Sequence, residues 1–91
     1  MRPEDVDSPR EKLSNLTVVH NAAAEGWSVA TFMWLHEDGL RRRVGIRRNG
    51  DDGEVGNPQS RGVATWFVLP ENLIAAFVEM YAARRERKNA L

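Results

Sequence analysis

The clearest structural signal in this chain is a pair of strand-forming runs separated by a short polar turn. Residues 27–36 are rich in aromatic and β-branched side chains, and residues 40–48 follow the turn cluster Glu37-Asp38-Gly39. Two such runs around a compact turn predict an antiparallel hairpin. Both faces of the first run are apolar, which predicts a central strand or one that is covered on each side.

The register of this hairpin follows if Asp38 and Gly39 are the two turn residues, because directly opposed residues of an antiparallel pair share a face. Met33 then opposes Val44 on the face that we expect to be the core. One extra residue in the turn would invert this assignment. The opposite, arginine-lined face would pair Trp34 with Arg43, His36 with Arg41, and Ala30 with Arg47.

The N-terminal part of the chain is harder to assign. Residues 1–13 are rich in charge and proline, so we expect a flexible N-terminal segment followed by a single domain over residues 14–91. Three consecutive β-branched residues favour a strand from about Asn15. The sequence Ser8-Pro9-Arg10-Glu11 also has the form of a capping box, so a helix over residues 13–19 is the alternative.

The C-terminal part predicts a strand and then a helix. Residues 63–69 form the strand, and Pro70 suits the first helical turn, where its missing N–H costs nothing. Together these elements predict an α+β domain with a four-stranded, mostly antiparallel sheet, strongly curved or barrel-like, packed by the C-terminal amphipathic helix. The expected core residues are Val18, Val29, Met33, Val44, Ile46, Phe67, Leu73, Ile74, Phe77 and Val78.

Composition limits the classes of function. The chain has 91 residues and no cysteine, which excludes a disulfide framework and a thiolate zinc site, and we expect no metal or cofactor. No apolar run is long enough to span a bilayer, so we expect a cytoplasmic protein without a membrane partner. The net charge is zero, which argues against a dedicated nucleic-acid binder. Residues 41–91 nevertheless carry ten basic against six acidic residues, which allows a basic face.

A polar loop joined to an aromatic strand has the most distinctive amino-acid sequence of the chain. Residues 56–62 read GNPQSRG and residues 65–70 read TWFVLP. With shorter pieces around residues 25–30 and 43–50, they resemble a family of small bacterial proteins of unknown function from mobile gene pools, of the integron gene cassette type. The likeness covers roughly residues 15–80. It implies a bacterial accessory protein and brings no catalytic residue with it.

Two surfaces are candidates for binding. Guanidinium groups pair with phosphates and an exposed indole can stack on a base, so the arginine-lined strand could bind nucleic acid. The alternatives are that this arginine-lined face is exposed to solvent or that it packs against a second copy of the chain. The loop offers hydrogen-bonding groups to a small-molecule ligand, or satisfies its own backbone. The candidate residues are Trp34, Arg41, Arg43 and Arg47 on the strand, and Asn57, Gln59, Ser60, Arg61 and Trp66 in or beside the loop.

Catalysis has the weakest support, since neither His20 nor His36 has a nucleophile at a recognised motif spacing. The sequence therefore favours a non-enzymatic binding or interaction module that forms a homodimer. Weak nucleic-acid binding through the arginine-lined strand is the first alternative. A small enzyme with a ligand near Arg61 and Trp66 is the second.

Overall fold

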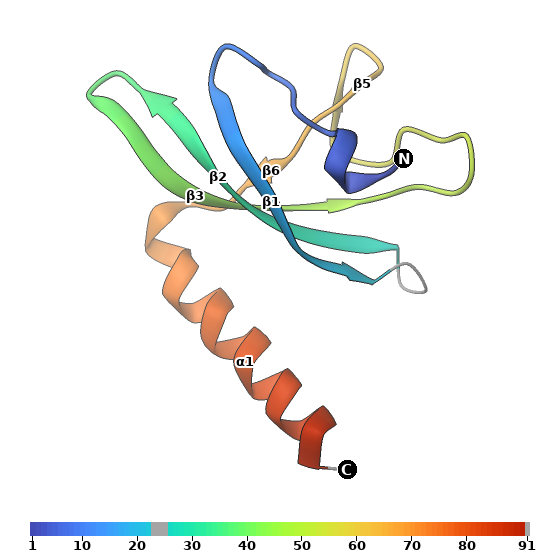
Figure 1. The fold of residues 1–91 in the computed structure, drawn as a ribbon, viewed down its shortest axis with the longest axis vertical. Helices are drawn as coiled ribbons and strands as arrows, with labels where there is room; N and C mark the ends of the chain where they lie inside the picture. Colours follow the sequence, from blue (N-terminus) through green and yellow to red (C-terminus); the bar gives the residue numbers. More distant parts are fainter. Residues whose placement is uncertain (23–25, 91) are drawn as a thin grey trace.

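A computed structural model describes the chain over residues 1–22 and 26–90, and its side chains over residues 1–22 and 26–84. A four-stranded sheet has the order β1-β2-β3-β6, with antiparallel neighbours throughout (Figure 1). Its strands are β1 (Leu13–Ala22), β2 (Trp27–His36), β3 (Gly39–Arg48) and β6 (Phe67–Val68). The other elements are η1 (Pro3–Asp5), the two-stranded hairpin of β4 (Gln59–Ser60) and β5 (Val63–Ala64), η2 (Glu71–Leu73) and α1 (Ile74–Ala90).

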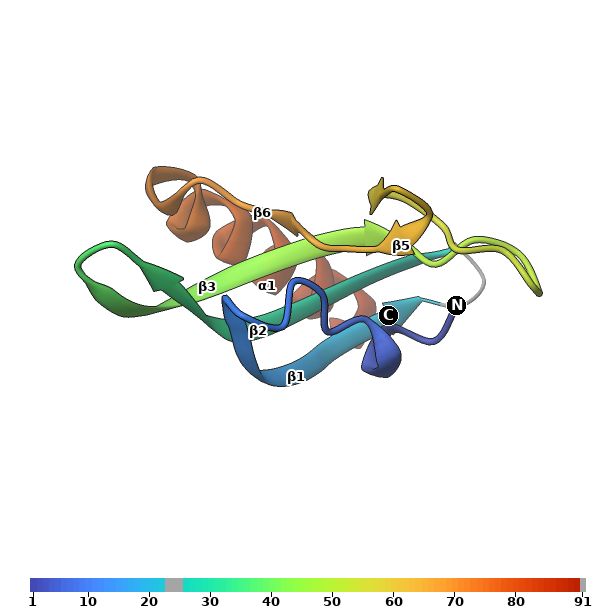
Figure 2. The ribbon, with the colours of Figure 1, turned by 90° about the horizontal axis from the view of Figure 1, so that it is seen from above.

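The predicted fold class is confirmed: the protein is α+β, with a four-stranded antiparallel sheet and one C-terminal helix. The sheet is open, with β1 and β6 at its edges, so the barrel-like form is not found (Figure 2). Residues 13–19 belong to a strand and not to a helix. No helix of the described residues is both long and apolar enough to cross a membrane.

The hairpin of β2 and β3 forms as predicted, but its register differs by two residues. His36 opposes Gly39, so Glu37 and Asp38 are the turn residues. An even shift keeps every side chain on its predicted face, because side chains alternate with a period of two. The pairs on the arginine-lined face change: Trp34 opposes Arg41, Phe32 opposes Arg43, and Ser28 opposes Arg47.

The hydrophobic core lies on the arginine-lined face, and the prediction that the opposite face is the core is wrong. Phe32 is only 2% exposed, and its ring centroid lies 6.1 Å from that of Trp34 and 6.3 Å from that of Trp66. Of the expected core residues, Val44 is buried, whereas Phe67, Leu73 and Val78 are about half exposed. The buried core cluster consists of Val6, Leu13, Ala30, Phe32, Ala64 and Trp66.

Segments that precede and follow the hairpin cover this core. Val6 is 1% exposed, and its carbonyl accepts a hydrogen bond of 2.7 Å from the indole N–H of Trp66. The N-terminal ammonium group donates to the carbonyl oxygens of Asn49 and Glu54 at 3.1 and 3.2 Å. Residues of the segment 1–13 therefore pack against the core and bond to the loop after β3. One aliphatic side chain, Val6, and one aromatic side chain, Trp66, both from irregular segments, therefore determine which face of the sheet is buried.

Candidate binding cleft

The arginines that the sequence singles out are mostly internal. Arg47 is 1% exposed, and its guanidinium donates hydrogen bonds to the carbonyl oxygens of Val55 and, at 2.6 Å, of Thr65. Burial lowers the pKa of Arg47 from its ordinary value, because desolvation disfavours the charged form. Arg43 is 9% exposed and donates to the carbonyl of Leu69. Both guanidinium groups fasten later segments onto the sheet.

Arg41 remains at the surface, where two carboxylates surround it. Its guanidinium donates to Asp38, and it donates to Glu71 at 3.2 Å. The hydrogen bond from Arg41 is the main cause that lowers the pKa of the Asp38 carboxyl. Glu71 also lies 3.8 Å from His36 and 3.9 Å from Arg43, so the positive charge of this cluster already has local counter-charges. A polyanion would have to compete with them.

Trp34 does not present an open indole face beside these arginines. It is half-buried, it packs against the core through Phe32, and the ammonium of Lys12 lies 5.9 Å from its ring centroid. The predicted binding face is therefore divided. Arg43, Arg47 and the indole belong to the core and its rim, and Arg41 belongs to an ion-paired surface cluster.

The first half of the GNPQSRG stretch closes over the end of β3. Gly56 has φ +77°, and a Cβ atom there would lie 2.1 Å from the carbonyl oxygen of Arg48 and 2.7 Å from the guanidinium of Arg47. Asn57 and Arg48 exchange two backbone hydrogen bonds of 2.7 and 3.0 Å. A side chain at position 56 would block this approach. Glycine is therefore required at position 56 for this loop to pack against Arg47 and Arg48.

The second half of the stretch forms the β4–β5 hairpin. The amide of Gln59 donates to the carbonyl of Gly56 at 3.2 Å, and Ser60 and Arg61 are exposed at the turn. Trp66, in contrast, is buried. The structure therefore does not gather the predicted loop residues with Trp66 or with the arginine-lined strand into one site.

A cleft of about 380 Å³ opens on the other side of the sheet, between the sheet and α1. We call the sheet surface that carries Trp27, Val29 and Ile46 the outer face; Val29 and Ile46 oppose each other in the β2–β3 register. The walls are mainly apolar. The described residues that line the cleft are His20, Trp27, Ser28, Val29, Ile46, Phe77, Met80, Tyr81 and Arg84.

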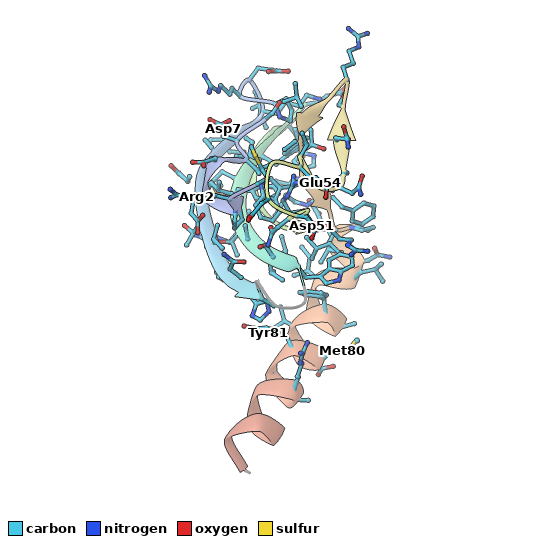
Figure 3. All side chains as sticks on the ribbon, turned by 90° about the vertical axis from the view of Figure 1, so that its right-hand side faces the viewer. Arg2, Asp7, Asp51, Glu54, Met80 and Tyr81 are labelled. Atoms are coloured by element: carbon cyan, nitrogen blue, oxygen red, sulfur yellow. The ribbon has the colours of Figure 1, made fainter. Side chains whose placement is uncertain are left out.

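Strand and helix periodicity place these side chains. Alternation along β2 puts Trp27 and Val29 on one face, and spacings of three and four residues put Phe77, Tyr81 and Arg84 on one side of α1. A hydrogen bond of 3.1 Å links the Nδ1 atom of His20 to the Tyr81 hydroxyl, and the two rings meet edge to face at 5.3 Å and 77°. In Figure 3, Tyr81 reaches from α1 toward the end of β1. The helix is thus fastened to the sheet at this point.

Elsewhere the helix and the sheet do not close over each other. Leu73 is 50% exposed and Met80 is 71% exposed, although both belong to the apolar side of the C-terminal segment. Trp27 on the outer face is 43% exposed. The cleft therefore has an apolar floor, polar groups at His20, Tyr81 and Arg84, and an open side.

This arrangement can hold a small, mainly apolar molecule. Pockets of roughly 300–1,000 Å³ with apolar walls and a few polar groups are typical ligand sites. A tyrosine hydroxyl is both a donor and an acceptor, so Tyr81 can bind a ligand group while it keeps its bond to His20. In the described part of the chain, no group of three or more His, Asp or Glu side chains could hold a metal ion.

Sequence reasoning missed the cleft because it assigned Val29, Ile46 and Phe77 to the core and His20 to an ordinary strand position. One signal was available. A strand that is apolar on both faces needs two covers, and the sequence predicts a helix only after residue 70.

Comparison with protein-family models, with curated proteins and with solved structures gave no match. The resemblance to small bacterial proteins of mobile gene pools stays a prediction.

Proposed function

We propose that the protein is a non-enzymatic binding module and that its ligand is a small aromatic molecule with one hydrogen-bonding group. The observation that carries this proposal is the cleft of about 380 Å³ between α1 and the outer face. Its volume falls within the range of roughly 300–1,000 Å³ that small-molecule sites occupy. A bacterial, cytoplasmic accessory role fits the resemblance of the GNPQSRG and TWFVLP stretches and is part of the proposal.

The lining determines the chemistry of the ligand. Trp27, Phe77 and Tyr81 contribute aromatic rings, which favour offset or edge-to-face contacts with another ring. The hydroxyl of Tyr81 supports one polar contact beside His20. A fused or substituted ring with a single hydroxyl group would satisfy both kinds of wall.

The cleft is better placed for binding than the arginine-lined strand. Arg43 and Arg47 are buried against carbonyl oxygens, and Arg41 is ion-paired with Asp38 and Glu71. Binding without catalysis is favoured because no carboxylate is among the described residues that line the cleft. An acid or base at its walls would have to come from His20 or Tyr81, which bond to each other.

The three tryptophans provide a direct test with internal controls. Trp27 lines the cleft, whereas Trp34 and Trp66 belong to the opposite side of the sheet. We expect 2-naphthol to shift the indole N–H signal of Trp27 in ¹H–¹⁵N correlation spectra and to leave the other two signals in place. Trp27→Phe assigns the signal.

A cleft-filling variant completes the test. Ile46→Trp should abolish the response of Trp27 to 2-naphthol because the new indole occupies the cleft. Val63→Trp adds the same side chain on the β4–β5 hairpin, where Val63 is 52% exposed, and should leave binding unchanged. The proposal fails if millimolar 2-naphthol leaves the Trp27 signal of the wild type unmoved, or shifts all three indoles alike.

A further inference from the structure

We infer that the ligand of the cleft is an aromatic carboxylate, which lays its ring on the apolar floor and places its carboxylate beside Tyr81 and Arg84. The inference rests on the proposed function and names the hydrogen-bonding group of the ligand. It adds a requirement for negative charge, and this requirement can be tested separately from binding itself.

The polar side chains at the cleft mainly supply hydrogen-bond donors. Arg84 lines the cleft, and a guanidinium has five N–H donors and no acceptor, so it can bind a ligand while it keeps a contact within the chain. Ser28 also lines the cleft, but it is fully buried and its hydroxyl donates to Asn49 at 2.8 Å. No carboxylate or amide side chain is among the described residues at the walls. A ligand group that accepts hydrogen bonds therefore fits this lining.

The His20–Tyr81 pair can add a donor to the one from Arg84. Its two polar atoms lie 3.1 Å apart, so either can donate to the other. When the Nδ1 atom of His20 carries a proton, it donates to the Tyr81 oxygen, and the phenolic O–H is left to donate to the ligand. Tyr81 and Arg84 are three residues apart on α1 and both line the cleft. They offer one donor group to each oxygen of a carboxylate.

A second guanidinium lies beside the aromatic wall. Arg48 opposes Trp27 in the β2–β3 register, and its Cζ atom lies 5.9 Å from the ring centroid of Trp27. Within the described part of the chain, Arg48 forms no ion pair, whereas Arg41 at the other end of the hairpin is paired with Asp38 and Glu71. Positive charge beside apolar walls attracts an anion into a cleft. The charge of Arg48 therefore favours a negatively charged ligand.

A carboxylate matches these donors better than a phosphate does. The planar fork of a guanidinium pairs with the two oxygens of a carboxylate. A phosphate monoester has three terminal oxygens and a charge of about −1.5 to −2 at neutral pH. The described lining offers one guanidinium and one phenolic hydroxyl beside mainly apolar side chains. Burial of a second negative charge against such walls is unfavourable.

Two ligands with the same ring separate the charge from the ring. At neutral pH 2-naphthoate is an anion and 2-naphthol is neutral. In titrations that follow the indole N–H signal of Trp27, we expect 2-naphthoate to bind the wild type at least about tenfold more tightly than 2-naphthol, because hydrogen bonds to charged groups are the stronger ones. Rising salt should weaken the binding of 2-naphthoate and reduce this preference.

Arg84→Gln tests the source of the preference, which it should largely remove. Arg61→Gln is the matched control, because Arg61 is exposed at the β4–β5 turn, and it should keep the preference of the wild type. The preference is a ratio of two affinities for one protein. A substitution that only distorts the cleft weakens both ligands and leaves this ratio in place, so the ratio separates recognition of charge from a structural role.

Equal affinities of the wild type for the two ligands would overturn the inference and leave the proposed binding function standing. The same holds if Arg84→Gln keeps the full preference. Tighter binding of 2-naphthyl phosphate than of 2-naphthoate would overturn the assignment of a carboxylate. If neither 2-naphthol nor 2-naphthoate moves the Trp27 signal, the proposed function fails together with the inference.

Discussion

Replacement of Arg47 by alanine is the sharpest test of whether its buried guanidinium holds later segments of the chain against the sheet. The guanidinium is 1% exposed and donates to the carbonyl oxygens of Val55 and Thr65. Hydrogen bonds from a charged donor contribute about 1.5–3 kcal/mol each, so the two bonds contribute roughly 3–6 kcal/mol. Desolvation of the cation opposes this contribution, and it also lowers the pKa of Arg47. With the cavity that alanine leaves, we expect a net loss of about 3–4 kcal/mol of unfolding free energy.

Arg47→Met separates the charge from the volume. Methionine keeps most of the side-chain volume, loses the two donors, and no longer requires burial of a cation. We therefore expect roughly half of the loss that alanine causes. If the two variants are equally destabilised, volume contributes little and the two hydrogen bonds dominate.

Urea unfolding at neutral pH measures these losses, with the slope of the transition as a check on the unfolded state. Arg61→Ala is the control, because Arg61 is exposed at the β4–β5 turn and should change stability by less than about 0.5 kcal/mol. A loss of unfolding free energy for Arg47→Ala as small as that of the control would refute this role of Arg47. It would show that Arg47 does not hold the segments around Val55 and Thr65 against the sheet.

Two further predictions concern the sheet faces and the surface cluster. Phe32→Ala should cost about 3–5 kcal/mol, because Phe32 is 2% exposed, whereas Phe77→Ala in the open cleft should cost only about 1–2 kcal/mol in the same urea assay; equal losses would contradict the placement of the core. Asp38 should titrate below its ordinary pKa in carboxyl-detected NMR, and Arg41→Ala should return it toward that value. Since this pKa is lowered in the folded state, the ion pair stabilises the fold above the unfolded pKa of about 3.9 and is lost as pH falls through the folded pKa; an unchanged Asp38 titration in the variant would contradict it.

Periodicity predicted β2, β3 and α1, but it did not identify the buried face of the sheet. The single strand predicted over residues 63–69 is wrong, because this segment forms two short strands, β5 and β6, that belong to different sheets. The alternation in residues 27–36 correctly divides the side chains of β2 into two faces, and that division holds although the turn lies at residues 37 and 38. Both faces are apolar, so alternation alone cannot say which one is covered. Val6 and Trp66 make that choice. Both belong to segments without a repeating pattern, one of which has a composition typical of a flexible terminus.

The arginine-lined strand shows how a correct face assignment can still give the wrong environment. Arg43 and Arg47 do share a face, as predicted, but the carbonyl oxygens that receive their hydrogen bonds come from residues 55, 65 and 69. Contacts over such separations depend on the path of an irregular loop. The glycine at position 56 was a visible clue, because a glycine in a polar loop often marks a close backbone approach. The sequence does not indicate that this glycine lies against Arg47 and Arg48.

The cleft depends on the distance between α1 and the sheet, which no local sequence pattern specifies. Phe77 and Tyr81 share one side of α1, and Val29 and Ile46 share one face of the sheet, as the periods of a helix and a strand require. The contact that sets the spacing between the layers is the bond from His20 to Tyr81, across 61 residues. This polar contact fastens the helix at one end of the outer face and leaves apolar side chains unpaired around it. In the described part of the chain, α1 is the α-helix that faces the outer face, and it leaves part of this apolar surface open around the His20–Tyr81 contact.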